Sequence, residues 1–98
     1  MKESQLQIEM SEEVAEGTYA NLAVIAHSTS EFVFDFIRMM PGISKAKVKS
    51  RIVMTPEHAK RLLAALNDNI MKYEAQFGEI NVPEIGNYVP APMFKGEA

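Results

Sequence analysis

Three apolar runs follow one another in this chain, separated only by short polar connections. Residues 18–27, 32–40 and 46–54 are rich in the β-branched and aromatic side chains that strands favour. Ser28-Thr29-Ser30-Glu31 separates the first two runs, and Pro41-Gly42 opens the second connection. Because connections this short join antiparallel neighbours, the sequence predicts an antiparallel meander.

A further strand and an acidic connection are expected ahead of the meander. Leu6, Ile8 and Met10 alternate with polar residues, which is the period of a half-buried strand. A sheet of about four strands is therefore predicted. The acidic connection that follows ends at Gly17 and has room for one helical turn.

Residues 56–77 carry the pattern of one long amphipathic helix. Thr55 is a good N-cap, Pro56 fits the first helical position, and Glu57 complements the helix dipole. Gly78 is suited to end the helix. The apolar positions recur every three or four residues and form one stripe: Ala59, Leu62, Leu63, Leu66, Ile70, Tyr73 and Phe77.

These elements predict a single α+β domain over residues 1–78, a size that one hydrophobic core can serve. Residues 79–98 contain proline and glycine but also apolar side chains such as Ile85, Tyr88 and Phe94. That composition favours an extended C-terminal arm that lies on a surface, either of its own subunit or of a neighbour.

Turn chemistry and charge also predict the register of the meander. A two-residue turn at Thr29-Ser30 sets His27 opposite Phe32, Ile25 opposite Phe34 and Leu22 opposite Ile37. In the next hairpin, pairing of opposite charges sets Asp35 opposite Arg51, Phe34 opposite Ile52 and Phe32 opposite Met54.

This register makes both faces of the sheet apolar. The face expected to receive the helix carries Tyr19, Ala23, Ile25, Phe32, Phe34, Phe36, Val48, Ile52 and Met54. The opposite face is the candidate oligomer interface and carries Leu22, Val24, Val33, Ile37, Met39 and Val53, with Asp35, Lys47, Lys49 and Arg51 to one side. One helix covers one face, and soluble monomers rarely expose a large apolar patch. We therefore expect a homo-oligomer, with a dimer as the first expectation; the alternative is that the C-terminal arm covers this face within one chain.

Charge and composition narrow the range of functions. The net charge is −3, with ten Lys and Arg against thirteen Asp and Glu, which argues against a dedicated nucleic-acid binder. The absence of cysteine excludes disulfides, thiol chemistry and cysteine zinc sites. Neither a secretory signal pattern nor a run of about 18 apolar residues is present, so we expect a cytoplasmic protein without membrane partners.

Catalytic groups are scarce. His27 falls beside a turn and His58 in the first turn of the helix, where local hydrogen bonding or capping explains each more simply than catalysis. Asp35 interrupts an apolar strand, and a cross-strand Arg51 or Lys49 accounts for it. The acidic cluster Glu12, Glu13 and Glu16 lacks the spacing of a calcium loop. We therefore predict no enzyme, no metal site and no cofactor.

Lys45, Lys47, Lys49 and Arg51 alternate and so would line one face of a strand. Such a basic stripe could follow a phosphate backbone, which makes a nucleic-acid-associated protein the alternative function. Aromatic residues for stacking on bases are not interleaved with it. A charged edge strand that discourages aggregation is the competing interpretation.

Several segments also carry a family resemblance: EVAEGTYANLAVIAHS at residues 13–28, EFVFDF at 31–36, KAKVKSRI at 45–52 and TPEHAKRLL at 55–63. With Pro41-Gly42, they resemble the small bacterial domain-of-unknown-function family 3467 over most of residues 6–77. That resemblance implies boundaries but no activity. The order of elements is also similar to that of the subunit of the export chaperone SecB, without a shared motif, and such a likeness transfers no function.

Taken together, the two apolar sheet faces, the apolar arm and the few catalytic groups predict a binding protein. The expected function is that of a non-enzymatic, homo-oligomeric binding or adaptor module that recognises protein or peptide. The sequence does not identify the partner.

Overall fold

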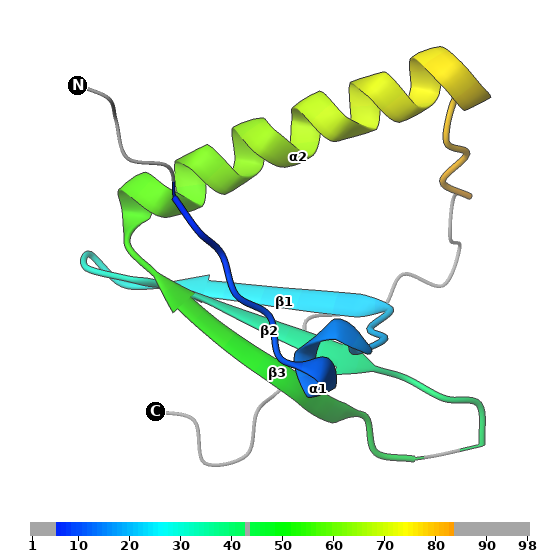
Figure 1. The fold of residues 1–98 in the computed structure, drawn as a ribbon. Coiled ribbons are helices and arrows are strands. Elements are labelled where there is room, and N and C mark those ends of the chain that lie inside the picture. The colour runs from blue at the N-terminus through cyan, green and yellow to red at the C-terminus, as the bar shows by residue number, and fades with distance from the viewer. Residues whose placement is uncertain (1–5, 43, 84–98) are drawn as a thin grey trace.

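The computed structural model describes residues 6–42 and 44–83 and has the predicted α+β architecture (Figure 1). A short helix α1 (Glu12–Ala15) is followed by strands β1 (Leu22–His27), β2 (Phe32–Arg38) and β3 (Lys47–Met54) and by the long helix α2 (Pro56–Phe77). The strands form one antiparallel sheet in the order β1-β2-β3. The meander is confirmed, but the described sheet has three strands and not four.

The predicted register of both hairpins is confirmed. His27 lies opposite Phe32 and Leu22 opposite Ile37 in the first hairpin, while Asp35 lies opposite Arg51 in the second. The Ser28 N–H donates to the Glu31 carbonyl at 2.9 Å, and the Ser28 hydroxyl accepts from the backbone of the turn. These bonds close a two-residue turn and thereby fix which residues share a face.

One irregularity of the sheet was not predicted. Phe36 pairs with Ser50 while Ile37 pairs with Val48, so Lys49 is an extra residue on β3 and forms a β-bulge. The bulge breaks the alternation of side chains along β3. Val48 therefore lies across from Ile37, on the opposite face to the one that its sequence position predicts.

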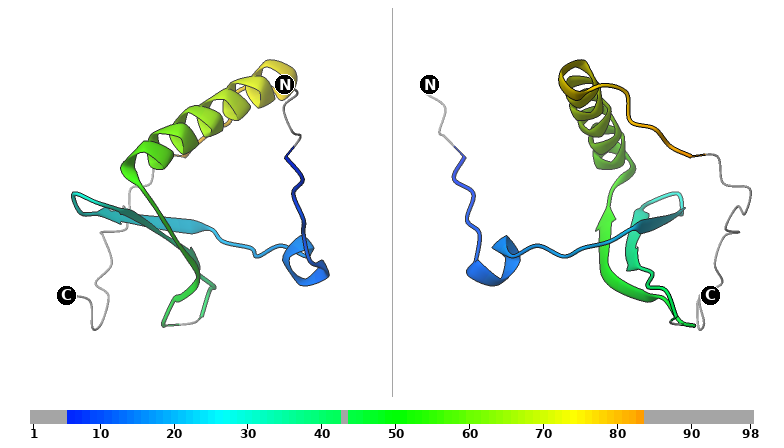
Figure 2. Two further views of the ribbon diagram at one scale, coloured as in Figure 1. Left: turned by 60° about the vertical axis from the view of Figure 1, so that its left-hand side comes forward. Right: turned by 90° about the vertical axis from the view of Figure 1, so that its right-hand side faces the viewer.

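The predicted strand at residues 6–10 is wrong for the chain's own sheet. This segment is extended, but it makes no ladder with any described strand. Ser11 caps α1 through a hydrogen bond from the Val14 N–H, and that turn directs the chain away from the sheet (Figure 2). The single helical turn expected in the acidic connection is present as α1.

The first strand is also shorter and more exposed than predicted. It begins at Leu22 rather than at residue 18, and most of its residues are exposed although both faces were expected to be covered. The reason is its position, because β1 is an edge strand with β2 on one side only. The other two strands begin and end within two residues of the prediction.

Helix α2 has the predicted bounds and caps. The Thr55 side chain accepts a hydrogen bond from the His58 N–H at 3.3 Å, and Pro56 occupies the first position. The helix ends at Gly78, whose φ of 99° is costly for any residue with a Cβ. Charged residues on the outer face form the pairs Glu57–Arg61 and Asp68–Lys72, each four residues apart.

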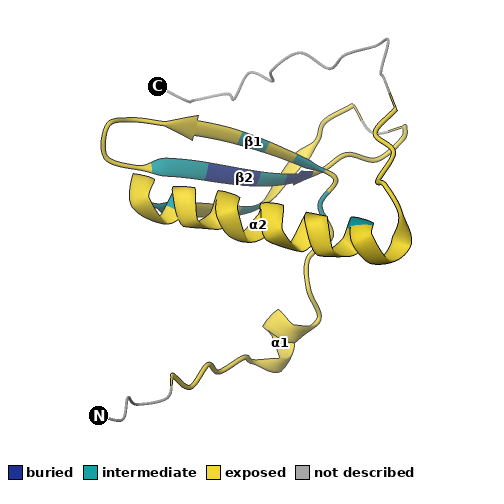
Figure 3. Cartoon of the chain, turned by 90° about the horizontal axis from the view of Figure 1, so that it is seen from above, coloured by how far each residue is buried: buried dark blue, intermediate teal, exposed yellow. Residues whose placement is uncertain are grey.

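The chain on its own builds a very small core. Helix α2 starts at the end of β3, lies over one face of the sheet and rises away from it towards its C-terminal end (Figures 1 and 2). No residue of α2 is buried. Among the described residues, only Phe34, Asp35 and Ile37 are buried, and all three belong to the central strand β2 (Figure 3).

The C-terminal arm is described only as far as residue 83. Residues 79–83 form neither helix nor strand, and the Ile80 N–H donates to a Glu74 carboxylate oxygen at 3.0 Å. The remainder of the predicted arm, including Ile85, Tyr88 and Phe94, lies outside the described residues.

Candidate functional site

The face of the sheet that was predicted to receive the helix does lie towards α2. Together they enclose an open apolar groove of about 350 Å³. Its lining comes from β1, β2 and the first half of α2: Ile25, Phe32, Phe34, Pro56, Ala59, Lys60, Leu62, Leu63 and Leu66. Lys60 supplies the one ionisable side chain of that lining, so the groove offers shape and apolar surface rather than catalytic groups.

An aromatic row runs along the sheet side of this groove. The rings of His27 and Phe32 stack with centroids 5.3 Å apart, and those of Phe32 and Phe34 with centroids 6.4 Å apart. His27 was expected to be hydrogen-bonded at the turn; the contact that the structure gives its ring is the one with Phe32. Phe34 is buried, so His27 and the partly exposed Phe32 provide the accessible surface of this row, and aromatic rings give rigid surface at little cost in conformational entropy.

Beyond the groove, the apolar stripe of α2 continues with no partner among the described residues. Leu66, the last helix residue that lines the groove, is 54% exposed, and beyond it Tyr73 is 50% and Phe77 65% exposed. The rings of Tyr73 and Phe77 contact each other at a centroid distance of 4.9 Å, one turn apart on the same side of the helix. The helix rises about 1.5 Å per residue, so from Ala59 to Phe77 the stripe is about 27 Å long. Contiguous exposed apolar surface of this kind is uncommon on soluble monomers.

The register places five of the six residues of the candidate oligomer interface on the opposite face of the sheet, and the sixth, Met39, follows the end of β2. Ile37 is buried, whereas Leu22, Val24 and Val33 are partly exposed. Met39, just beyond the end of β2, is 38% exposed, and Val53 on β3 is 50% exposed. The bulge adds Val48 beside Ile37. The face is therefore apolar around Ile37 and along its margins.

An ion pair interrupts this face. Arg51 donates from Nε to one carboxylate oxygen of Asp35 at 2.7 Å and from Nη2 to the other at 2.8 Å. The Asp35 side chain is 6% exposed and that of Arg51 49%. The hydrogen bonds from Arg51 hold the pKa of Asp35 below its ordinary value, against the opposing effect of burial. The predicted cross-strand pairing is thus confirmed, and it gives Asp35 a structural explanation.

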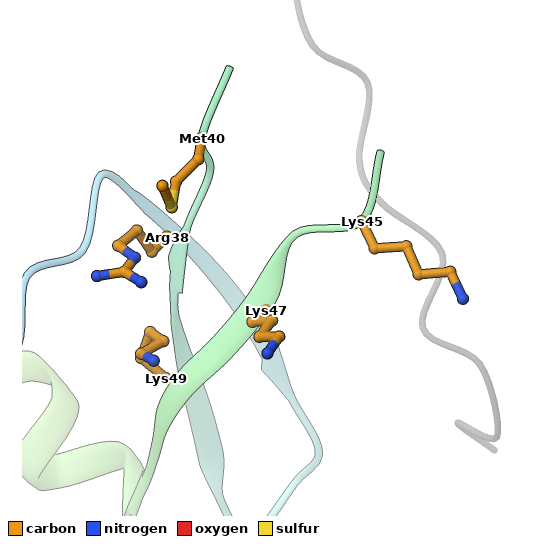
Figure 4. Close-up of a pocket in the computed structure, with 5 residues that line it drawn as sticks. All are labelled: Arg38, Met40, Lys45, Lys47 and Lys49. Carbon is orange, nitrogen blue, oxygen red and sulfur yellow. The ribbon is translucent and has the colours of Figure 1, made fainter. Parts of the chain in front are cut away.

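The basic residues of β3 do not act as one stripe. Arg51 is engaged with Asp35, and the bulge at Lys49 shifts the residues that precede it. Lys45, Lys47 and Lys49 instead line a separate cavity of about 160 Å³ with Arg38 and Met40 from the end of β2. Figure 4 shows Lys45 pointing away from the other lining residues, among which Arg38 and Lys49 extend on the same side of the strands. The described residues that line this cavity include no carboxylate.

Asn21 is a structurally important residue that the sequence did not single out. Its side-chain Oδ1 accepts from the Met39 N–H at 2.8 Å, and its Nδ2 donates to the Met39 carbonyl at 3.0 Å. The Asn21 side chain thus makes the two hydrogen bonds to the Met39 backbone that a paired strand residue would make. These bonds hold the chain in place just after the end of β2. A polar residue directly before an apolar strand was the available signal.

The other candidate groups do not assemble into a site. His58 lies at the start of α2 with its backbone N–H on Thr55. Within residues 6–42 and 44–83, no group of three or more His, Asp or Glu side chains is arranged to hold a metal ion, and this covers the acidic residues of α1. In the same residues, neither helix is long and apolar enough to span a membrane.

Comparison with known proteins gives one result. The family model described as "Protein of unknown function (DUF3467)" matches residues 1–82, which is slightly more of the chain than the resemblance in the sequence covered. No curated protein and no solved structure matches this chain. Because the family model covers most of the chain, including every strand and helix of the structure, the protein belongs to the DUF3467 family.

Proposed function

We propose that this protein is a non-enzymatic, homo-oligomeric binding module that recognises an apolar segment of a protein or peptide. The observation that carries the proposal is the groove between α2 and the sheet, which continues into the uncovered stripe of α2. Its stacked aromatic rings and leucines match the surfaces on which apolar segments dock.

Self-association is part of the proposal because one chain buries so little. Three buried residues among those described are far fewer than a stable domain of 98 residues needs. The candidate interface around Ile37 is one surface on which a second copy would gain apolar burial. A binding role then fits a module in which α2 lines a groove with its first half and rises away from the sheet towards its C-terminal end (Figure 1).

The groove is tested with Leu66→Glu, which places a charge in its lining. Fluorescently labelled peptides rich in Leu and Phe are titrated with the full chain, and the same peptides with Asp replacing Leu serve as the ligand control. Burial of one leucine is worth about 1.5–3 kcal/mol, so we expect affinity to fall by about tenfold or more.

The matched control is Ala64→Glu, which adds the same charge to an exposed position of α2 that does not line the groove. It should bind as the wild type does. Equal affinity of the wild type and Leu66→Glu, or failure of the wild type to prefer the apolar peptides, would contradict the proposal.

The basic cavity supports a second candidate function, association with nucleic acid. Arg38, Lys45, Lys47 and Lys49 form a local cationic surface on a protein that is acidic overall. The test is retention on single-stranded DNA at low salt, with Lys47→Ala/Lys49→Ala as the variant. Salt-sensitive retention that is lost in the variant would support this candidate, and the absence of retention in the wild type would remove it.

A further inference from the structure

Residues 6–10 form an extended segment that makes no hydrogen bond to any other described segment. Its apolar side chains all point into solvent: Leu6 is 85% exposed, Ile8 81% and Met10 64%. They alternate with Gln7 and Glu9, which is the pattern of a strand with one covered face. The segment therefore has the sequence pattern of a strand but pairs with no described strand.

Strand β1 lacks a described neighbouring strand on one side. It is an edge of the sheet, so about half of its backbone N–H and C=O groups point away from β2 without a described strand to receive them. Its sequence, LAVIAH, contains none of the lysines or prolines with which proteins usually protect a free edge. The other edge, β3, does carry such protection in Lys47, Lys49 and Arg51.

The two elements match in length and in exposure. Five residues of extended chain span about 17 Å, close to the length of the six-residue strand β1. On β1 the apolar residues on the helix side, Ala23 and Ile25, are exposed, whereas on the other side Leu22 and Val24 are partly covered and only Ala26 is exposed. Apolar side chains are therefore needed on the helix side of this edge, beside Ile25 in the wall of the groove.

The segment is not placed to reach its own β1. Helix α1 lies between them along the chain, and Figure 2 shows both α1 and the segment standing away from the sheet. A second copy of the chain presents the same unprotected edge without that restriction.

We infer that residues 6–10 of one chain add as a strand to the free edge of β1 in a second copy, with Leu6, Ile8 and Met10 on the side that faces α2. A reciprocal exchange joins two chains in a closed dimer. Each sheet then has four strands, one of them donated. The inference goes beyond the proposed function, because it names the elements through which the copies associate and extends the floor of the groove.

Disulfide trapping tests the exchange, because the chain has no cysteine of its own. An Ile8→Cys chain carrying an affinity tag is mixed with untagged Ala23→Cys, Ile25→Cys or His27→Cys chains and oxidised. Adjacent strands bring Cα atoms within the range that a disulfide needs. We expect a mixed, disulfide-linked dimer with at least one of the three β1 positions.

Two controls make the result specific. Val53→Cys, an exposed position on β3, should give no mixed product with Ile8→Cys. Ile8→Asp should shift the concentration for half-association upwards by about tenfold or more, whereas Gln7→Asp on the polar side should leave it unchanged.

The exchange is overturned if no β1 position is trapped, if Val53→Cys is trapped equally, or if the double variant Ile8→Cys/Ile25→Cys links only within one chain. If trapping fails while light scattering still finds an oligomer, the exchange fails and self-association through another surface stands. If the wild type is a monomer at every concentration, both the exchange and the proposed self-association fail. The peptide titration still tests the groove independently.

Discussion

Replacement of Arg51 by methionine is the most informative test of the sheet. The change keeps an apolar stem of similar length and removes both hydrogen bonds to Asp35, which measure 2.7 and 2.8 Å. The Asp35 carboxylate is then left with a side chain 6% exposed and without the guanidinium that compensates its charge. Removing one partner of a fully buried pair costs about 3–5 kcal/mol. Because the Arg51 side chain is 49% exposed and solvent screens the pair, we expect a loss of about 2 kcal/mol at pH 7.

The loss should depend on pH with a defined sign. In the wild type, Arg51 lowers the pKa of Asp35 below its ordinary value of 3.8, so the pair stabilises the fold above that pH and this contribution is lost as pH falls towards the lowered pKa. In Arg51→Met only burial remains, which raises the pKa of the carboxyl. The variant is therefore destabilised above the raised pKa and is relieved of that cost as the acid protonates. The difference between the two proteins should shrink as pH falls from 7 to 3.

The assay is urea unfolding followed by far-ultraviolet circular dichroism at one fixed protein concentration, because association couples to stability. Lys47→Met is the matched control, since it removes a positive charge from β3 without removing a described contact to Asp35. Asp35→Asn/Arg51→Met has no carboxyl with a raised pKa, so its difference from wild type keeps only the pH dependence of the wild-type Asp35 and should vary less with pH than that of the single variant. A loss below about 0.5 kcal/mol in Arg51→Met, or a loss that stays constant with pH, would refute this account of the pair.

Two further substitutions test local features of the fold. Asn21→Ala removes both hydrogen bonds to the Met39 backbone, and we expect a loss of about 1–2 kcal/mol in urea unfolding together with faster amide exchange at Met39. Unchanged exchange at Met39 would contradict the role given to Asn21. Thr55→Ala removes the N-cap of α2 and should cost about 1 kcal/mol, whereas Thr55→Ser should cost much less; equal losses would show that the cap bond to His58 contributes little.

Much of the fold could be predicted because the decisive signals are local. The turn at Thr29-Ser30 and the charge pair Asp35–Arg51 each fix a register, and a register determines every residue on a face. The caps Thr55 and Gly78 likewise fix where α2 begins and ends. Each of these signals lies within one turn of chain or one pair of opposite residues.

The errors came from features that depend on neighbours elsewhere in the structure. The alternation in residues 6–10 predicts a strand, but a strand needs a partner, and the partner is not encoded in the segment itself. No glycine or proline near Lys49 indicates a bulge in the sequence. A regular strand was therefore assumed, which put the basic residues in one stripe and Val48 on the wrong face of the sheet.

The expectation that α2 would be buried on the sheet also failed within one chain. The amphipathic pattern of Leu62, Leu66 and Ile70 indicates that one side of the helix packs against apolar surface. The pattern does not indicate whether that surface belongs to the same chain or to another one. Leu66 is 54% exposed on the isolated chain, which is the physical reason for proposing a binding function.

Sedimentation equilibrium of the full wild-type chain at several concentrations, with unfolding measured on the same samples, tests most directly the claim that a single copy leaves too much apolar surface uncovered. We predict a mass of at least twice that of one chain and an unfolding midpoint that rises with protein concentration. A monomeric mass at every concentration, with a cooperative unfolding transition independent of concentration, would contradict that claim.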